Sequence, residues 1–363
     1  LGYAGGWGRF EQSGGTFLAD TVTIGQQGTG IAQVSGGHFA IGTNGIEVGL
    51  RNGADGELRV DDAGALASTT GSLRVGNEGT GAVLMQAGQL RTGGVVIGLF
   101  GEGTWSHEGG LYDQLFGDFV VGHGAGDVDM AIPGGRHGEL TVSGGFLHPA
   151  GDVVLGAERG NGTVVVYGGT LAATGTPTSS IIVGQGSGAS SSGPSELRVR
   201  GDQSTLLANG DFWMNPNGVA DSSLLVAEII GPNHTPIRVG GDAHLSQGTL
   251  KVELNGYVVS PHDSWVLIEA GADFSNALAL MDSAIDASGY QGVTHAVPSL
   301  AGRVVDEFWR VDTSEAILPD GLDWQVSYTE HAVTLSVLAV PEPTWGLGGI
   351  PLLLWLLRRR RTR

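Results

Sequence analysis

The sequence predicts an all-β protein whose strands coil into a β-solenoid, in the form of a right-handed parallel β-helix. Three observations lead to this fold class. A Gly-rich pattern recurs at similar but unequal intervals through the first half of the chain. Glycine makes up 65 of the 363 residues, which is about 18% against a usual value of about 7%. No segment keeps a 3.6-residue apolar period for three turns, which argues against helical repeats.

The repeating pattern is clearest between Val22 and Phe39, which read VTIGQQGTGIAQVSGGHF. It consists of a short apolar run, a Gly, a polar turn, an alternating apolar run and a final Gly-Gly pair. The Gly after the first apolar run recurs at Gly25, Gly49, Gly76, Gly98, Gly122, Gly156 and Gly184. A repeat of this length is typical of a solenoid, in which each unit buries its apolar face against its neighbours.

Each repeat has room for two or three short strands separated by Gly turns, so we expect about seven or more coils. Successive coils would lie about 4.8 Å apart, as neighbouring strands of a sheet do. Glycine suits the corners because it reaches positive φ without the steric cost of a Cβ atom. These repeats define the first predicted domain, residues 1–254, whose last coils are irregular.

Residues 255–339 form the second predicted domain, a β-rich cap. Its expected strands are longer, from Ser264 to Glu269, from Phe308 to Asp312 and from Trp324 to Leu338, with one short helix from Ala277 to Ala287. A cap is expected because the open strand edge at the end of a solenoid is a template for aggregation.

The charge of the chain is strongly negative, since 18 basic and 37 acidic residues give a formal net charge of −19. Five of the basic residues lie in the last six positions, so the body is more acidic still. A surface of this sign argues against nucleic acid as a partner. The chain has no cysteine, which excludes disulfides and thiolate metal sites. Its Gly-rich runs follow a repeat rather than a strand-to-helix unit, so we expect no nucleotide cofactor.

The N-terminal residues, LGYAGGWGRF, lack the basic and apolar regions of a signal peptide. Because the next segment, Ser13-Gly14-Gly15-Thr16-Phe17, already matches the end of a repeat, we expect the sequence to be truncated. A leader removed by processing is the alternative.

The third predicted domain, residues 340–363, has three parts in a fixed order. They are Pro341-Glu342-Pro343, an apolar run from Thr344 to Leu357, and the cluster Arg358, Arg359, Arg360 and Arg361. Proline lacks the ladder N–H and ends a preceding strand. As a helix the apolar run would span about 21 Å, short of the hydrocarbon core of about 30 Å. We predict a short transmembrane helix in the inner membrane, with its arginines on the cytoplasmic side.

This three-part tail resembles the PEP-CTERM sorting signal of Gram-negative bacteria. The resemblance covers positions 340–363 alone. It implies that the membrane protease-transpeptidase exosortase recognises and processes the tail, in bacteria that usually make exopolysaccharide. More loosely, the body resembles the Gly-rich autotransporter-type β-strand repeats that often precede such tails. The apolar run is short, and Pro351 and the pair Gly348-Gly349 interrupt it, which departs from the family pattern. An ordinary tail anchor is the alternative.

Parallel β-helices include polysaccharide lyases and hydrolases, so the acidic residues and histidines of the repeats are candidates for catalytic residues. The pair Asp61-Asp62 and the turn at His123 superficially resemble the site of polygalacturonase-like glycosidases. Asp61 and His123 are too far apart in the sequence to lie on neighbouring coils, whereas carboxylates that hydrolyse a glycoside lie within about 10 Å of each other. We therefore predict no catalytic residues.

Two binding sites were weighed against simpler structural roles. One candidate is a Ca²⁺ site formed by Asp113, Asp118, Asp127 and Asp129. These residues lack the regular repeat of calcium-binding β-rolls, so solvated turns are the preferred interpretation. The ten histidines are scattered, and no metal site is expected. The aromatic residues Trp7, Trp105, Tyr112 and Trp213 could stack sugars if they shared an exposed face, although core packing is the preferred reading.

The leading hypothesis is a non-enzymatic structural or adhesive protein. It would be exported, sorted by an exosortase-type system, and held at the cell surface or in an extracellular matrix containing exopolysaccharide. The alternative is a secreted β-helix polysaccharide lyase or hydrolase, which requires carboxylates and basic residues clustered on adjacent coils of one face. A third hypothesis is a calcium-dependent matrix protein.

Overall fold

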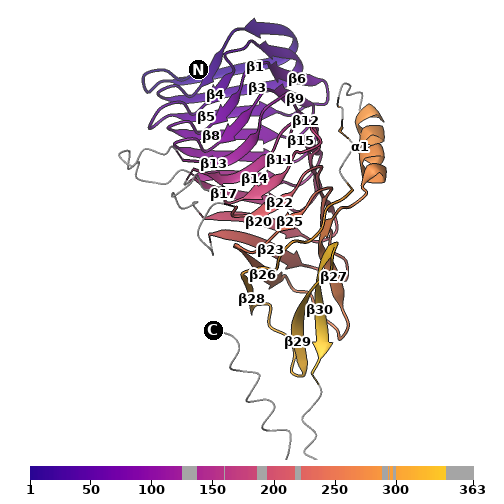
Figure 1. Cartoon of the computed structure of the whole chain (residues 1–363). Helices are drawn as coiled ribbons and strands as arrows, with labels where there is room; N and C mark the ends of the chain where they lie inside the picture. Colours follow the sequence, from indigo (N-terminus) through magenta and orange to yellow (C-terminus); the bar gives the residue numbers. More distant parts are fainter. Residues whose placement is uncertain are drawn as a thin grey trace, which may run out of the picture.

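The computed structural model describes residues 1–124, 137–158, 160–185, 194–216, 222–287, 293, 295–296 and 300–340. These residues are nearly all β: they form a 21-stranded sheet, a nine-stranded sheet and one helix. The strands lie across a tall, tapering stack, with the N-terminus near one end and the last strands at the other (Figure 1). The prediction of an all-β protein is confirmed.

The parallel strands pair in three series, which we call the first, second and third columns. The first column contains β1 (Trp7–Ala19), β3 (Thr29–Ile41), β5 (Asp55–Val60), β8 (Thr80–Met85), β11 (Glu102–His107), β14 (His137–Val142), β17 (Asn161–Val166), β20 (Ser195–Arg200), β23 (Ser223–Ile229), β26 (Gly248–Leu254) and β28 (Arg310–Glu315). Strands β1 and β3 are long enough to enter the second column as well.

The second column continues from β3 through β6 (Ala65–Thr69), β9 (Gln89–Thr92), β12 (Leu111–Gln114), β15 (Phe146–His148), β18 (Gly169–Ala173), β21 (Ser204–Ala208), β24 (Ile237–Val239) and β27 (Ser264–Ala270). The third column is the nine-stranded sheet, with β2 (Val22–Ile24), β4 (Ile46–Val48), β7 (Leu73–Val75), β10 (Val95–Ile97), β13 (Phe119–His123), β16 (Val153–Ala157), β19 (Ile181–Val183), β22 (Phe212–Met214) and β25 (Ala243–His244). Each repeat thus contributes one strand to each column.

Five of the seven glycines that mark the repeats directly follow a third-column strand, and Gly122 and Gly156 are the next-to-last residues of β13 and β16. All seven have positive φ, between 67° and 81°, as the corner prediction requires. The backbone must turn here from the third column into the first, and a Cβ atom on Gly76, for example, would lie 2.1 Å from the Glu102 carbonyl oxygen. The repeat therefore depends on glycine at this corner for both conformation and space.

A second row of glycines crosses the first column in register and faces the interior. Paired residues at this level are Gly8, Gly30, Gly56, Gly81, Gly103, Gly138, Gly162, Ser195, Ser223 and Gly248. We call this row the glycine ladder. Where serine replaces glycine, its hydroxyl reaches a third-column carbonyl: Ser223 Oγ lies 2.9 Å from the oxygen of Val183.

Inward-facing apolar side chains from all three columns form one continuous core. One repeat shows the packing well, because Trp105, Tyr112 and Phe119 come from β11, β12 and β13 and meet in the centre. Their ring centroids are 4.9 to 5.6 Å apart, and all three side chains are essentially buried. Such aromatic clusters add to the stabilisation that burial alone provides.

The parallel pairing continues past Leu254, because β27 pairs with β24 and β28 pairs with β26. The antiparallel strands β29 (Leu322–Tyr328) and β30 (Ala332–Ala339) then pair with each other, and β30 also pairs with β27. The prediction of one strand from Trp324 to Leu338 is wrong, because the chain reverses between Tyr328 and Ala332, where Thr329 Oγ1 accepts the N–H of Ala332. The predicted helix is present as α1 (Ser275–Ala287) and starts two residues earlier than expected.

Candidate functional site

The predicted sorting signal lies outside the described residues. This applies to Pro341, Glu342, Pro343, Arg358, Arg359, Arg360 and Arg361, and to the apolar run from Thr344 to Leu357. Within the part of the chain that the structure describes, no helix is long and apolar enough to cross a membrane.

The residues weighed as a glycosidase-like site have separate partners. Asp61 follows β5 of the first column and accepts a 2.5 Å hydrogen bond from Gln33, while Asp62 accepts the N–H of Gly64. His123 ends β13 of the third column, and its Nε2 lies 3.9 Å from a carboxylate oxygen of Glu158. The structure therefore places these residues in turns and at strand ends, in contact with neighbouring strands of the same column.

The residues weighed as a calcium site also diverge. Asp113 is a buried residue of β12, so the prediction of a solvated turn is wrong for it, and its carboxylate contacts Arg91 at 2.9 Å and His148 at 3.1 Å. Asp118 instead accepts the backbone N–H of Asp152. Asp127 and Asp129 lie outside the described residues. Across the described ranges, no three His, Asp or Glu side chains are placed to share a metal ion.

The four aromatic residues weighed as a sugar-stacking strip do not share one face. The prediction of core packing is confirmed for Trp105 and Tyr112. It is wrong for Trp7, which is exposed at the N-terminal end of the stack. Trp213 stacks on His244 of the next third-column strand, with ring centroids 3.5 Å apart and planes 8° from parallel.

The structure instead places a groove of about 570 Å³ on the outer face of the first column. It runs across β14, β17, β20, β23, β26 and β28, and no motif in the sequence indicates it. Its lining is mainly polar and consists of His137, Asn161, Thr163, Pro194, Ser195, Glu196, Ser222, Leu224, Thr249, Lys251, Arg310, Asp312, Ser314 and Glu315.

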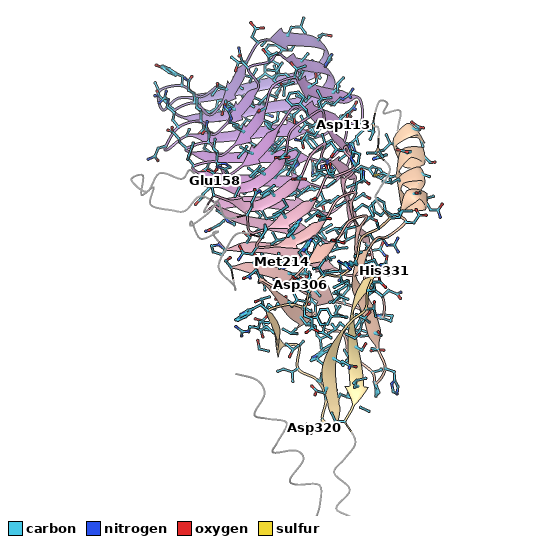
Figure 2. The ribbon with its side chains drawn as sticks, viewed as in Figure 1. Asp113, Glu158, Met214, Asp306, Asp320 and His331 are labelled. Carbon is cyan, nitrogen blue, oxygen red and sulfur yellow. The ribbon has the colours of Figure 1, made fainter. Side chains whose placement is uncertain are left out.

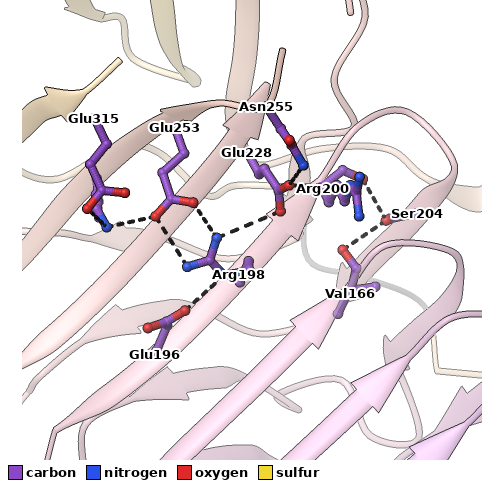
Figure 3. A network of polar contacts seen from close by, with 10 residues as sticks. Val166, Glu196, Arg198, Arg200, Ser204, Glu228, Glu253, Asn255 and Glu315 are labelled. Carbon is purple, nitrogen blue, oxygen red and sulfur yellow. Dashed lines mark hydrogen bonds and ion pairs between the residues drawn. The ribbon is translucent and has the colours of Figure 1, made fainter. Parts of the chain in front are cut away.

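A network of ion pairs centred on Arg198 shares Glu196, Lys251 and Glu315 with the lining of this groove (Figure 3). The Arg198 guanidinium contacts Glu253 through two nitrogens, the shorter contact being 2.5 Å, and its Nε donates to Glu196 at 3.0 Å. It also lies 3.7 Å from Glu228, whose other carboxylate oxygen accepts a 2.6 Å hydrogen bond from the side chain of Asn255. Strands β20, β23 and β26, together with Asn255 directly after β26, thus contribute side chains to one network of ion pairs and hydrogen bonds.

Lys251, the only lysine of the chain, extends the network into the groove. Its ammonium group lies 2.7 Å from Glu253 and 2.9 Å from Glu315. Both hydrogen bonds raise the pKa of Lys251. Burial would raise the pKa of Glu253, but the hydrogen bonds from Arg198 and Lys251 outweigh it, and the net pKa of Glu253 is lowered. The contacts between Lys251 and Glu253 therefore favour the charged forms of both groups.

Strand alternation explains why these side chains share a face. In β20, Leu197 and Val199 point into the core, so Glu196, Arg198 and Arg200 point outward. The register then aligns Arg198 with Val226, Lys251 and Asp312 on successive strands. The alternation is visible in the sequence, but this register spans repeats of unequal length, so the sequence alone did not reveal the cluster.

Comparisons with known proteins identify no relative: no family model, no curated protein and no solved structure matches this chain. The class of protein must therefore be inferred from the residues and their arrangement.

Replacing Arg198 by methionine is expected to lower the free energy of unfolding by about 1 to 2 kcal/mol, because Glu253 and Glu228 would each lose a charged partner. Urea titration at low salt measures the change, which should shrink in 0.5 M NaCl. The matched control is Arg74→Met, since Arg74 makes one exposed ion pair with Glu47, and its loss should cost less than about 1 kcal/mol. Equal losses in the two variants would show that the Arg198 network adds nothing beyond an ordinary surface pair.

Proposed function

We propose that this chain is a right-handed parallel β-helix that serves as a non-enzymatic structural or adhesive protein outside the cytoplasm. The observation that supports this most is the in-register pairing of parallel strands through three columns, in the order of the chain. The first column takes ten steps from β1 to β28, so at about 4.8 Å a step the rod would be about 48 Å long. A solenoid with this geometry offers long, regular faces to a matrix.

The compensated charges on the first column also support a structural role. Arg198, Lys251, Glu253 and Glu228 bind one another across neighbouring strands. Catalytic acids and bases usually have a pKa shifted toward the working pH, whereas these pairings move the pKa values of Lys251 and Glu253 away from neutrality. Their ion pairs connect the neighbouring strands β20, β23 and β26.

The sorting part of the proposal rests on the tail sequence. Pro341-Glu342-Pro343, the apolar run and the arginine cluster resemble a PEP-CTERM signal, so exosortase is the proposed partner. The tail would hold the protein at the inner membrane in transit, and the processed body would then reach the cell surface or the extracellular matrix. Exopolysaccharide is the proposed matrix component, because the resemblance connects such tails with bacteria that make it.

Intact mass and location of the protein, expressed with and without exosortase, test this proposal. We expect the tail to be lost only where exosortase is present, with the body outside the cell. The control replaces Pro341 and Pro343 by alanine, which should prevent processing without touching the stack. An uncleaved tail in both hosts would reduce the segment to an ordinary membrane anchor, and cytoplasmic protein with an intact tail would defeat the proposal.

A polysaccharide lyase or hydrolase is the second candidate, and the groove is the specific observation that favours it. Carboxylates and basic groups from β20, β26 and β28 line one face of adjacent coils, including Glu196, Lys251 and Asp312. Purified protein incubated with a panel of neutral and acidic polysaccharides should release no new chain ends if the structural proposal holds. Release that Lys251→Met abolishes, while the protein stays folded, would replace it with the enzyme.

A further inference from the structure

Helix α1 lies against one flank of the stack and covers an apolar part of the second column (Figure 1). Its residues Leu278, Met281 and Ile285 are buried, together with the preceding Phe274. They pack on outward-facing residues of three second-column strands, namely Leu111 in β12, Ala172 in β18 and Leu207 in β21. This is a small cluster, separate from the continuous core of the stack. The helix therefore acts as a cover for an apolar strip.

A polar contact beside this apolar cluster links the helix to His295. The His295 side chain is 6% exposed, and its Nε2 lies 2.9 Å from the Asp282 carboxylate of α1. Its Nδ1 lies 2.7 Å from Thr174 Oγ1, just after β18. The neighbouring Ala296 donates its N–H to the Thr174 carbonyl and accepts a hydrogen bond from the Asn209 side chain. His295 is thus joined on one side to α1 and on the other to the stack.

A second buried histidine faces His295 from the stack. His148, at the end of β15, meets the His295 ring edge to face, with centroids 4.7 Å apart. The Nδ1 of His148 lies 3.1 Å from Asp113, which also binds Arg91 (Figure 2 labels Asp113, beside α1). The Nε2 of His148 is buried and has no hydrogen-bond partner among the described residues, and the Nε2 of His295, although 2.9 Å from Asp282, does not meet hydrogen-bond geometry either, so that contact is a close approach of charged groups.

The charged groups around the two rings come from every element packed there. Arg91 in β9, Asp113 in β12 and His148 in β15 lie on the stack side, and Asp282 lies on the helix side. Asp286 of α1 is exposed to solvent. Since Arg91 and Asp113 already form a pair, a proton on each ring would place two positive charges close together in a poorly solvated position. Like charges this near repel strongly when water is excluded.

We propose that His148 and His295 form an acid-sensitive latch, in which added positive charge on this buried ring pair loosens α1 and uncovers the apolar strip of the second column. The uncovered surface would give the rod an adhesive apolar patch under mildly acidic conditions. This role is independent of the proposed sorting of the tail and of the groove.

The direction of the pH effect follows from the state of His295 in the fold. Burial lowers the pKa of His295, and the neighbouring charge of His148 lowers it further, against opposition from Asp282 and Asp113. A histidine whose pKa is lower in the folded state than in the unfolded chain destabilises the folded state when the pH falls below the unfolded-state pKa of about 6.5. The latch is therefore closed at pH 7 and weakens as the pH falls below that value.

Hydrogen exchange of the full chain, followed by mass spectrometry, tests the latch. After correction for the intrinsic pH dependence of exchange, peptides covering residues 275–287 should exchange at least tenfold faster at pH 5 than at pH 7. Peptides from β17 and β20 should change little, because local opening leaves the core paired. Equal protection of α1 at both pH values would overturn the proposal.

Two variants identify the groups responsible. The substitution His295→Gln should cut the acid response of α1 to less than threefold, whereas His38→Gln, which removes a histidine bonded to Ser68 in the neighbouring coil, should leave it at the wild-type value. If α1 of His295→Gln exchanges rapidly at both pH values, the acid response of His148→Gln tests the proposal instead. This variant keeps the contacts of His295 with Asp282 and Thr174. A wild-type acid response in His148→Gln would also overturn the proposal.

Discussion

Replacing Gly103 by alanine is expected to lower the free energy of unfolding by about 3 kcal/mol or more. Gly103 belongs to the glycine ladder, and a Cβ atom there would lie 2.3 Å from the backbone nitrogen of Gly98 and 2.4 Å from the carbonyl oxygen of Val75. Both obstacles are backbone atoms of the corner between two columns, so no side chain can rotate away. Forced overpacking of this kind usually costs about 1 to 3 kcal/mol, and backbone contacts raise the cost. Urea unfolding followed by circular dichroism measures the difference.

Gly14→Ala provides the matched control for this prediction. Gly14 lies in the outermost strand β1, and a Cβ atom built on it would meet no atom within 4 Å. Its substitution should change the free energy of unfolding by less than about 0.5 kcal/mol, as is usual at surface positions without special features. If Gly103→Ala were as stable as Gly14→Ala, the close contact between columns would not be a constraint on the repeat.

Acidification from pH 7 to pH 4 is expected to remove about 3 kcal/mol of stability through His107 alone. This side chain faces the core from β11, between Met85 and Val142 of the adjacent strands, and is completely buried. Burial lowers the pKa of His107 to about 4, with a smaller opposing effect from the backbone of Phe146. In the unfolded chain the group binds a proton near pH 6.5, so acid favours unfolding between pH 6.5 and 4.

Comparison of His107→Met with the wild type tests this prediction, because methionine already occupies the neighbouring position in β8. The variant should lose about 3 kcal/mol less than the wild type between pH 7 and pH 4 in urea titrations. Burial lowers the pKa of His234 to about 4 as well, so part of the acid sensitivity will remain. His137→Met, which removes a histidine that is 40% exposed, should leave the acid response unchanged. An identical acid response in His107→Met and wild type would contradict the assignment.

The repeating part of the fold could be predicted because its constraints are local. A corner with positive φ requires glycine, so Gly25, Gly76 and their equivalents mark each repeat in the sequence. Alternating apolar residues indicate the strands, and one apolar face implies a shared core. The core position of Trp105 also follows, since it occupies the apolar phase of β11.

The groove and the latch could not be predicted, because they depend on register between distant residues. Arg198 and Glu253 are separated by 55 residues, and Thr174 and His295 by 121. The repeats differ in length, so the sequence does not say which outward side chains align. The turn between β29 and β30 was missed for another reason, since Thr329-Glu330-His331 contains neither glycine nor proline, the usual signals of a reversal.

The direction of the ladder hydrogen bonds determines how this protein responds to mechanical load. Hydrogen bonds between successive strands of a column run along the axis of the stack, so tension between its two ends acts on one strand pair after another. A single repeat peeled from the end would lengthen the chain by about 80 Å when fully extended. Unfolding under such tension would proceed in steps and absorb work at each step, whereas a sideways load would be shared by many strand pairs at once.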